Sequence, residues 1–170
     1  MSKNIQQAPV LLNRDDFLLQ MLRHLSGTLQ DVIGLQEAEG FIALVGQKIG
    51  EEINQEYRQA LQLDRLNKAQ VAEVLVDLKK RVHGDFYIIE ETDSKIVFGN
   101  RQCPFEDKVI GREALCMMTS NVFGVIAAEN LTYAKVSIDE SIARGHSGCK
   151  VTLHFDPNSS AEGIEYYGSE

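Results

Sequence analysis

Apolar residues recur every three to four positions through the first half of the chain, which predicts three amphipathic helices. The first covers residues 14–33 and ends at Gly34, the second covers about 36–61, and the third begins at an Asn67 cap and ends near residue 82. The apolar positions of the first two helices are Leu18, Met21, Leu22, Leu25, Leu29 and Val32, and Ala38, Phe41, Ile42, Val45, Ile49 and Ile53.

From residue 85 the pattern becomes that of strands. Residues 85–91 and 95–100 are rich in β-branched and aromatic residues and flank a short polar turn, which predicts a hairpin. A fourth helix follows over about 112–130. Two alternating segments, around 134–138 and 149–155, predict a closing pair of strands. The order of elements predicts an α+β fold in which the helices pack on one side of an antiparallel sheet.

The same pattern divides the chain. Residues 1–12 are predicted to be a flexible lead and residues 13–156 a single domain. Residues 157–170 are polar, begin with Pro157, and predict a linker-like tail.

Two helical features bear on packing. Gly46 and Gly50 lie one turn apart on one side of the second helix, where each costs about 1 kcal/mol relative to alanine. We therefore expect another helix to approach closely there, in preference to a small ligand. The third helix ends in Lys79, Lys80 and Arg81, which complement the helix dipole and predict a solvated helix end.

The amino-acid composition limits the classes of partner that the protein is expected to bind. The 170 residues hold 17 Lys and Arg against 25 Asp and Glu, a net charge of −8, so a phosphate backbone would be repelled and direct nucleic-acid binding is disfavoured. Apolar runs fall well short of the roughly 18 residues that span a bilayer, and the first residues lack the apolar core of a signal peptide. We expect a cytoplasmic protein that uses no membrane. Phosphate-binding, metalloprotease and serine-hydrolase motifs are all missing, so we expect no enzyme.

The C-terminal third resembles the 4-vinyl-reductase-like domain, a module of small-molecule sensors and tetrapyrrole-related proteins. The resemblance rests on Phe123-Gly-Val-Ile-Ala-Ala128, Ala134-Lys-Val136 and Ile142-Ala-Arg-Gly-His-Ser-Gly-Cys-Lys-Val151. A helix, a strand and a glycine-containing turn that delivers a cysteine onto the last strand is similar to that family's closing pattern. Gly46 and Gly50 also resemble its N-terminal portion.

The resemblance implies a regulatory module that binds a small ligand between helices and sheet, often as a dimer, and commonly sits ahead of an output domain. In the aromatic-effector sensors of bacterial activators, the motif also holds a structural zinc through cysteines and an acidic residue. Here only Cys149 matches, because Ser141 and Ile138 stand where those sensors have the second cysteine and the acid. That zinc site is not carried over.

The three cysteines are the candidate ligands for a metal ion or an iron–sulfur cluster. Cys103 lies in a loop before Pro104, Cys116 on the fourth helix, and Cys149 on the last strand, on the face of Val151. If they converge, three thiolates suit a soft metal or an iron–sulfur cluster, and a cluster held by three cysteines leaves one iron open to a signal molecule. Zinc or haem are the alternatives. The competing interpretation is packing, since free cysteine behaves as a small buried hydrophobe.

Two histidines are candidates for a fourth ligand, and His146 in the turn is favoured over His154, which should face away from Cys149. An apolar ligand pocket is a vaguer expectation. Its candidate residues are Met117, Met118, Phe123 and Ile126, with Phe41 and Val45 opposite.

Three functions compete. We favour a sensory domain that binds a small ligand, or a metal or iron–sulfur cofactor at Cys103, Cys116 and Cys149, and signals to an output domain or partner, as a homodimer. The signal would be a small molecule, a gas or a redox change. The second is a tetrapyrrole-binding accessory or reductase-like protein, with Tyr87, Tyr133 and His83 as loose proton donors. The third is a non-catalytic assembly module.

Overall fold

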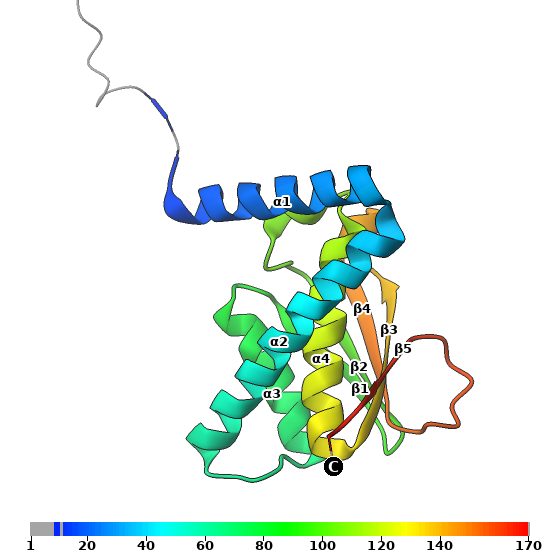
Figure 1. The fold of residues 1–170 in the computed structure, drawn as a ribbon. Coiled ribbons are helices and arrows are strands. Elements are labelled where there is room, and N and C mark those ends of the chain that lie inside the picture. The colour runs from blue at the N-terminus through cyan, green and yellow to red at the C-terminus, as the bar shows by residue number, and fades with distance from the viewer. Residues whose placement is uncertain (1–8, 11, 170) are drawn as a thin grey trace, which may run out of the picture.

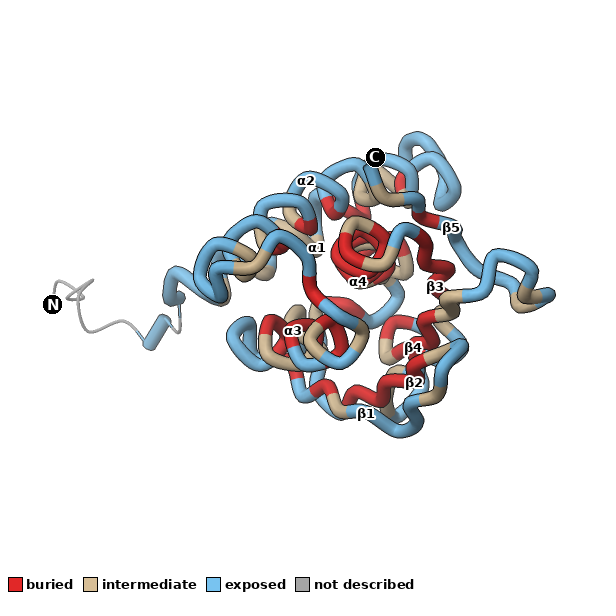
Figure 2. Tube along the Cα trace, turned by 90° about the horizontal axis from the view of Figure 1, so that it is seen from below, coloured by how far each residue is buried: buried red, intermediate tan, exposed pale blue. Residues whose placement is uncertain are grey.

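One apolar helix, α4 (Cys116–Leu131), lies at the centre of the computed structural model, which describes residues 9–10 and 12–169. Helices α2 (Leu35–Leu61) and α3 (Lys68–Arg81) cover one side of α4, and the sheet covers the other (Figures 1 and 2). Every residue from Ser120 to Ala128 is therefore buried, rather than a single stripe. The predicted α+β fold with helices on one side of an antiparallel sheet is confirmed.

Capping residues set the helix bounds where the sequence placed them. The Asn13 side chain accepts a hydrogen bond from the Asp16 backbone at the start of α1 (Arg14–Ile33). Asn67 and Gln70 form a reciprocal capping box at the start of α3. The predicted fourth helix is divided: a short 3-10 turn, η3 (Glu113–Leu115), precedes α4.

The sheet has five antiparallel strands in the order β1-β2-β4-β3-β5. The predicted strands appear as β1 (Phe86–Glu91), β2 (Lys95–Asn100), β3 (Tyr133–Glu140) and β4 (Cys149–His154). The first two form the expected hairpin. Short 3-10 turns, η2 (Glu106–Val109) and η4 (Ile142–Arg144), occupy the long connections.

The fifth strand corrects the predicted domain boundary. Residues 157–170 do not form only a linker-like tail, because Ile164–Tyr167 is β5 and pairs with β3. Tyr166 is 9% exposed, packs where Gly124 of α4 lacks a side chain, and shares a 2.9 Å hydrogen bond with Ser120. Alternation over four residues after a polar run is a weak signal, and the packing partner lies 42 positions away. The predicted lead over residues 1–12 falls almost wholly outside the described residues.

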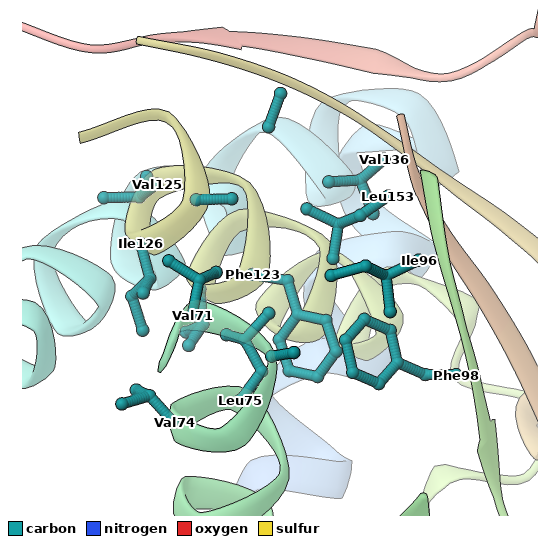
Figure 3. Packing of buried hydrophobic residues seen from close by; sticks show 14 of the residues in the cluster. Val71, Val74, Leu75, Ile96, Phe98, Phe123, Val125, Ile126, Val136 and Leu153 are labelled. Atoms are coloured by element: carbon teal, nitrogen blue, oxygen red, sulfur yellow. The ribbon is translucent and has the colours of Figure 1, made fainter. Parts of the chain in front are cut away.

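Two packing arrangements hold α4 in place. On the α2 side, a Cβ at Gly46 would lie 2.9 Å from the Asn121 Cβ, and one at Gly50 would lie 3.2 Å from the Val122 Cα, so the expected close helix approach is confirmed. On the sheet side, the Phe123 ring meets Phe98 edge-on at 5.3 Å (Figure 3).

The segment Glu113–Leu131 is long and apolar enough to cross a membrane by length and composition, among the described residues. Two thirds of it (67%) is buried inside the domain, so its apolarity is explained by its place in the core.

Replacing Tyr166 by alanine tests whether β5 belongs to the domain. We expect the free energy of unfolding to fall by about 3 kcal/mol, because the change empties a packed site beside Gly124. The matched control is Tyr167→Ala, since Tyr167 is 69% exposed; it should cost about 1 kcal/mol or less. Urea denaturation followed by circular dichroism measures both. Equal, small effects would restore the linker interpretation.

Candidate functional site

Three cysteines from three different elements line one small cavity at the N-terminal end of α4. Cys103 comes from the loop after β2, Cys116 is the first residue of α4, and Cys149 is the first residue of β4. The cavity has a volume of about 30 Å³ and is otherwise almost wholly apolar in lining. A loop, a helix and a strand that are distant in the sequence thus deliver their thiols to one place.

Strand register explains this arrangement. Asn100, the last residue of β2, pairs directly with Cys149, so the chain leaves β2 beside that thiol and reaches Cys103 three residues later. Val151 of β4 also lines the cavity, as the predicted alternation from Cys149 requires. His154 faces the opposite side of the sheet, also as predicted.

The Cys149 thiol lies beside two hydrogen-bond donors. Its sulfur accepts from the Ile142 backbone N–H at 3.5 Å and from the Asn100 side-chain amide at 3.6 Å. The Ser141 side chain acts to lower the pKa of Cys116, and the Phe105 backbone acts to lower that of Cys103. Donors of this kind stabilise thiolates and sulfur-ligated metals.

Burial nevertheless favours the neutral thiols in the protein as it stands. It raises the pKa of Cys116 to about 11, against the opposing effect of Ser141, and it raises the pKa of Cys103. At pH 7 these two groups are therefore protonated and poor nucleophiles until something draws off their protons.

Lys79 lies in a different environment from the one that the sequence predicts. The sequence predicts a solvated helix end with Lys80 and Arg81, but Lys79 is 5% exposed. Its ammonium donates to Thr119 Oγ1 at 2.7 Å and lies 5.2 Å from the centre of the Phe86 ring. Lys79 continues the four-residue spacing of Val71 and Leu75 on the buried face of α3, which is the signal that could have revealed it.

Burial also perturbs this ammonium. It lowers the pKa of Lys79 to about 8, and negative charge at the three cysteines would oppose the shift only partly. Among the described residues, no carboxylate lies within ion-pair distance of Lys79.

Metal-ion geometry is not preformed. Within residues 9–10 and 12–169, no group of three or more His, Cys, Asp or Glu side chains is placed to hold a metal ion. A cavity of about 30 Å³ accepts one or two waters but not a cluster. The thiols would have to move together for an ion, and the Cys103 loop outward for a cluster, so ligation stays a prediction.

The other candidates are distributed differently. His146 Nδ1 lies 3.1 Å from the Ser141 carbonyl oxygen, close to the cavity wall but not in it. The expected apolar pocket is wrong in its composition: Phe123 and Ile126 are core residues, whereas Phe41 and Val45 are 57% and 47% exposed. Tyr87, Tyr133 and His83, the proposed proton donors, are not among the residues that line the cavity.

Comparison with known proteins assigns this chain to a family. The model of the family described as methanogen output domain 1 matches residues 21–154, most of the chain. The chain belongs to that family. The matched segment holds all three cysteines and Lys79, whereas β5 lies beyond it. No curated protein matches the sequence significantly.

Solved structures share the fold at low sequence identity. The phenol-responsive sensory domain of the transcription activator PoxR, solved with phenol, is 15% identical with a TM-score of 0.64, over 85% of this chain and 75% of that one. Subunit 3 of a trafficking protein particle complex from Naegleria fowleri, covalently bound to palmitic acid, is 11% identical with a TM-score of 0.59, over 91% and 99%. An Fe(II) unliganded H-NOX protein mutant from K. algicida is 15% identical with a TM-score of 0.58, over 86% and 76%.

The family match shows membership of the methanogen output domain family, and the solved structures show that the fold is shared. They do not name the 4-vinyl-reductase-like family, so that resemblance stays an expectation.

Lys79→Met tests whether the buried charge is uncompensated. In metal-free, reduced protein at pH 7 we expect the free energy of unfolding to rise by roughly 1–4 kcal/mol, because an apolar side chain of similar length replaces a buried ammonium. The pKa of Lys79 falls from 10.5 when unfolded to about 8 when folded, so its charge costs stability below pH 8. The advantage of Lys79→Met should therefore shrink between pH 8 and 10.5.

Urea denaturation at pH 7 and pH 9.5 measures the effect, with Lys80→Met as the control because Lys80 is exposed. A Lys79→Met protein less stable than the wild type at pH 7 would show that the ammonium is already satisfied.

Proposed function

We propose that this domain senses a signal at the three-cysteine cavity through a cysteine-ligated iron–sulfur cluster or metal ion. One observation carries the proposal: Cys103, Cys116 and Cys149 line a single cavity although 46 positions separate the first from the last. Thiolates are the ligands that iron–sulfur clusters and soft metals prefer. A cluster bound by three cysteines keeps one iron for a gas, a redox partner or another small molecule, which suits a regulatory role rather than a catalytic one.

The segment between Cys103 and Cys116 connects the cavity to α1 and could transmit a conformational change to that helix. The Arg23 guanidinium of α1 donates to the backbone carbonyls of Lys108 at 2.6 Å and Ile110 at 2.9 Å. Arg112 packs against Gly27 of α1, where a Cβ would lie 2.7 Å from its Nε. A shift of this segment on cofactor binding or loss would therefore move α1 with it.

The partner would bind on α1 and α2. Half of the apolar positions that the sequence predicts on these helices are exposed. Helix α1 extends beyond the rest of the fold, and the only residues of α1 that are buried are Ser26 and Gly27 (Figures 1 and 2). Large apolar side chains at least 40% exposed on these two helices are Phe17, Leu18, Met21, Leu25, Val32, Phe41, Leu44, Val45 and, at the far end of α2, Leu61. A surface of this kind marks an interaction site, and we propose a second copy of the chain as its partner.

The second candidate function is a non-catalytic assembly module. The same exposed apolar surface favours it, because an assembly subunit needs an interface and no cofactor. The trafficking subunit that shares the fold shows that the architecture is compatible with such a role.

Anaerobic purification tests the cofactor. We expect a coloured protein with stoichiometric iron and sulfide, and we expect Cys103→Ala to lose them while keeping its far-ultraviolet circular dichroism, because the loop thiol is a ligand. Gln102→Ala, an exposed neighbour in the same loop, is the control and should retain the full complement.

Other spectra decide against a cluster. Stoichiometric zinc in a colourless protein would make the site a structural metal centre, and an intense Soret band would indicate haem. A colourless, metal-free protein would return the cysteines to ordinary packing and favour the assembly module.

Introducing a charge on α2 tests the self-association. We expect sedimentation equilibrium to give about 38 kDa, twice the 19.0 kDa of one chain. Leu44→Glu should give a monomer, because Leu44 is 62% exposed within the apolar surface and a charge there would be desolvated in a dimer. Gln47→Glu adds the same charge on the neighbouring face and should stay dimeric. A wild-type protein at 19.0 kDa across the micromolar range would contradict the dimer.

A further inference from the structure

Lys79 carries a positive charge that nothing in the described part of the protein neutralises. Its side chain is 5% exposed, and its one hydrogen bond goes to the neutral hydroxyl of Thr119 at 2.7 Å. The rings of Phe86 and Phe123 lie 5.2 and 5.3 Å from the ammonium. Aromatic faces attract a cation, but more weakly than a carboxylate does.

The two neighbouring basic residues do not share this situation. Arg81 lies on the surface and forms an ion pair with Asp77 at 2.6 Å, and Lys80 is exposed. The buried cation is therefore specific to position 79 of α3, where the side chain reaches Thr119 of α4.

The ammonium lies behind the wall of the three-cysteine cavity, one side chain away from it. Both Thr119 and Phe86, which contact it, also line that cavity. Negative charge at Cys103, Cys116 or Cys149 would favour the protonated form of Lys79. By the same attraction, a buried cation behind an apolar cavity wall favours negative charge inside the cavity.

The charge of a loaded site matches this requirement. Three thiolates around a divalent ion, or around a cluster core of the same charge, leave one net negative charge, which one ammonium balances. Without that balance, both the buried ammonium and the buried anionic centre would cost free energy.

We infer that Lys79 is the counter-charge of a negatively charged metal–thiolate centre formed by Cys103, Cys116 and Cys149. The inference rests on the proposed function and adds a residue to it. Lys79 is a positioning residue in this role, because it is not a ligand of the metal and its charge balances the net negative charge of the whole centre.

Cadmium ion is the probe, because it binds thiolates directly and its sulfur-to-cadmium charge-transfer absorption reports the bond. Metal-free, reduced protein is titrated anaerobically in competition with a chelator, for the wild type and for Lys79→Met, Lys79→Arg and Lys80→Met. We expect Lys79→Met to bind Cd²⁺ roughly tenfold to a thousandfold more weakly, the range expected on losing an adjacent opposite charge.

The controls separate charge from shape. Lys79→Arg keeps the charge and should restore most of the affinity, and Lys80→Met should match the wild type. Metal-free Lys79→Met should unfold at a temperature no lower than the wild type, so that weaker binding cannot be attributed to a damaged fold.

Several results would overturn the inference. Wild-type affinity in Lys79→Met would remove the counter-charge role while leaving the cysteine site intact. An unfolded Lys79→Met, or a folded Lys79→Arg as weak as Lys79→Met, would make Lys79 a structural residue. If the wild type binds no Cd²⁺, or if alanine at each cysteine leaves the affinity unchanged, the proposed function itself is wrong and the inference falls with it.

Discussion

Close contact between α2 and α4 positions the rest of the molecule. Because Gly46 and Gly50 present no side chains, the backbones approach until Asn121 and Val122 touch α2 directly. That contact leaves the opposite side of α4 free to cover the sheet, where Phe123 packs between Phe98 and Phe86. A bulkier residue at either glycine would push α4 away, and the sheet, α3 and the cavity would lose their common wall.

The cavity is a consequence of this arrangement rather than a separate feature. Cys116 begins α4, Cys149 begins β4, and Cys103 follows the end of β2, so all three lie where core elements start or end. Side chains at such ends are held by rigid segments on one side and by a loop on the other. The site can thus be precise and still open through the segment that precedes α4.

The features that could be predicted from the sequence are those that depend on residues close together in the chain. Asn13 and Asn67 mark helix starts through bonds that span three residues, and alternation marks the faces of β4. Lys79, β5 and the exposed surface of α1 depend instead on distant partners. A basic residue in the last turn of a helix is solvated unless the fold brings a sheet against it. An apolar stripe has the same sequence pattern whether it packs within its own chain or against another one.

The position of the cavity also determines which elements would move when the structure around the cysteines changes. The cavity lies at the N-terminal end of α4. Residues 168 and 169 lie at its C-terminal end, where the Gly168 N–H donates to the Thr132 carbonyl and the Ser169 hydroxyl donates to the Glu129 carboxylate. Sixteen helical residues separate these ends, which is about 24 Å. Helix α1, in contrast, contacts the segment between the cysteines directly through Arg23. A small displacement of this segment would therefore reach α1 through two hydrogen bonds. It would reach β5 through the first turns of α4, because Tyr166 shares a hydrogen bond with Ser120, four residues after Cys116.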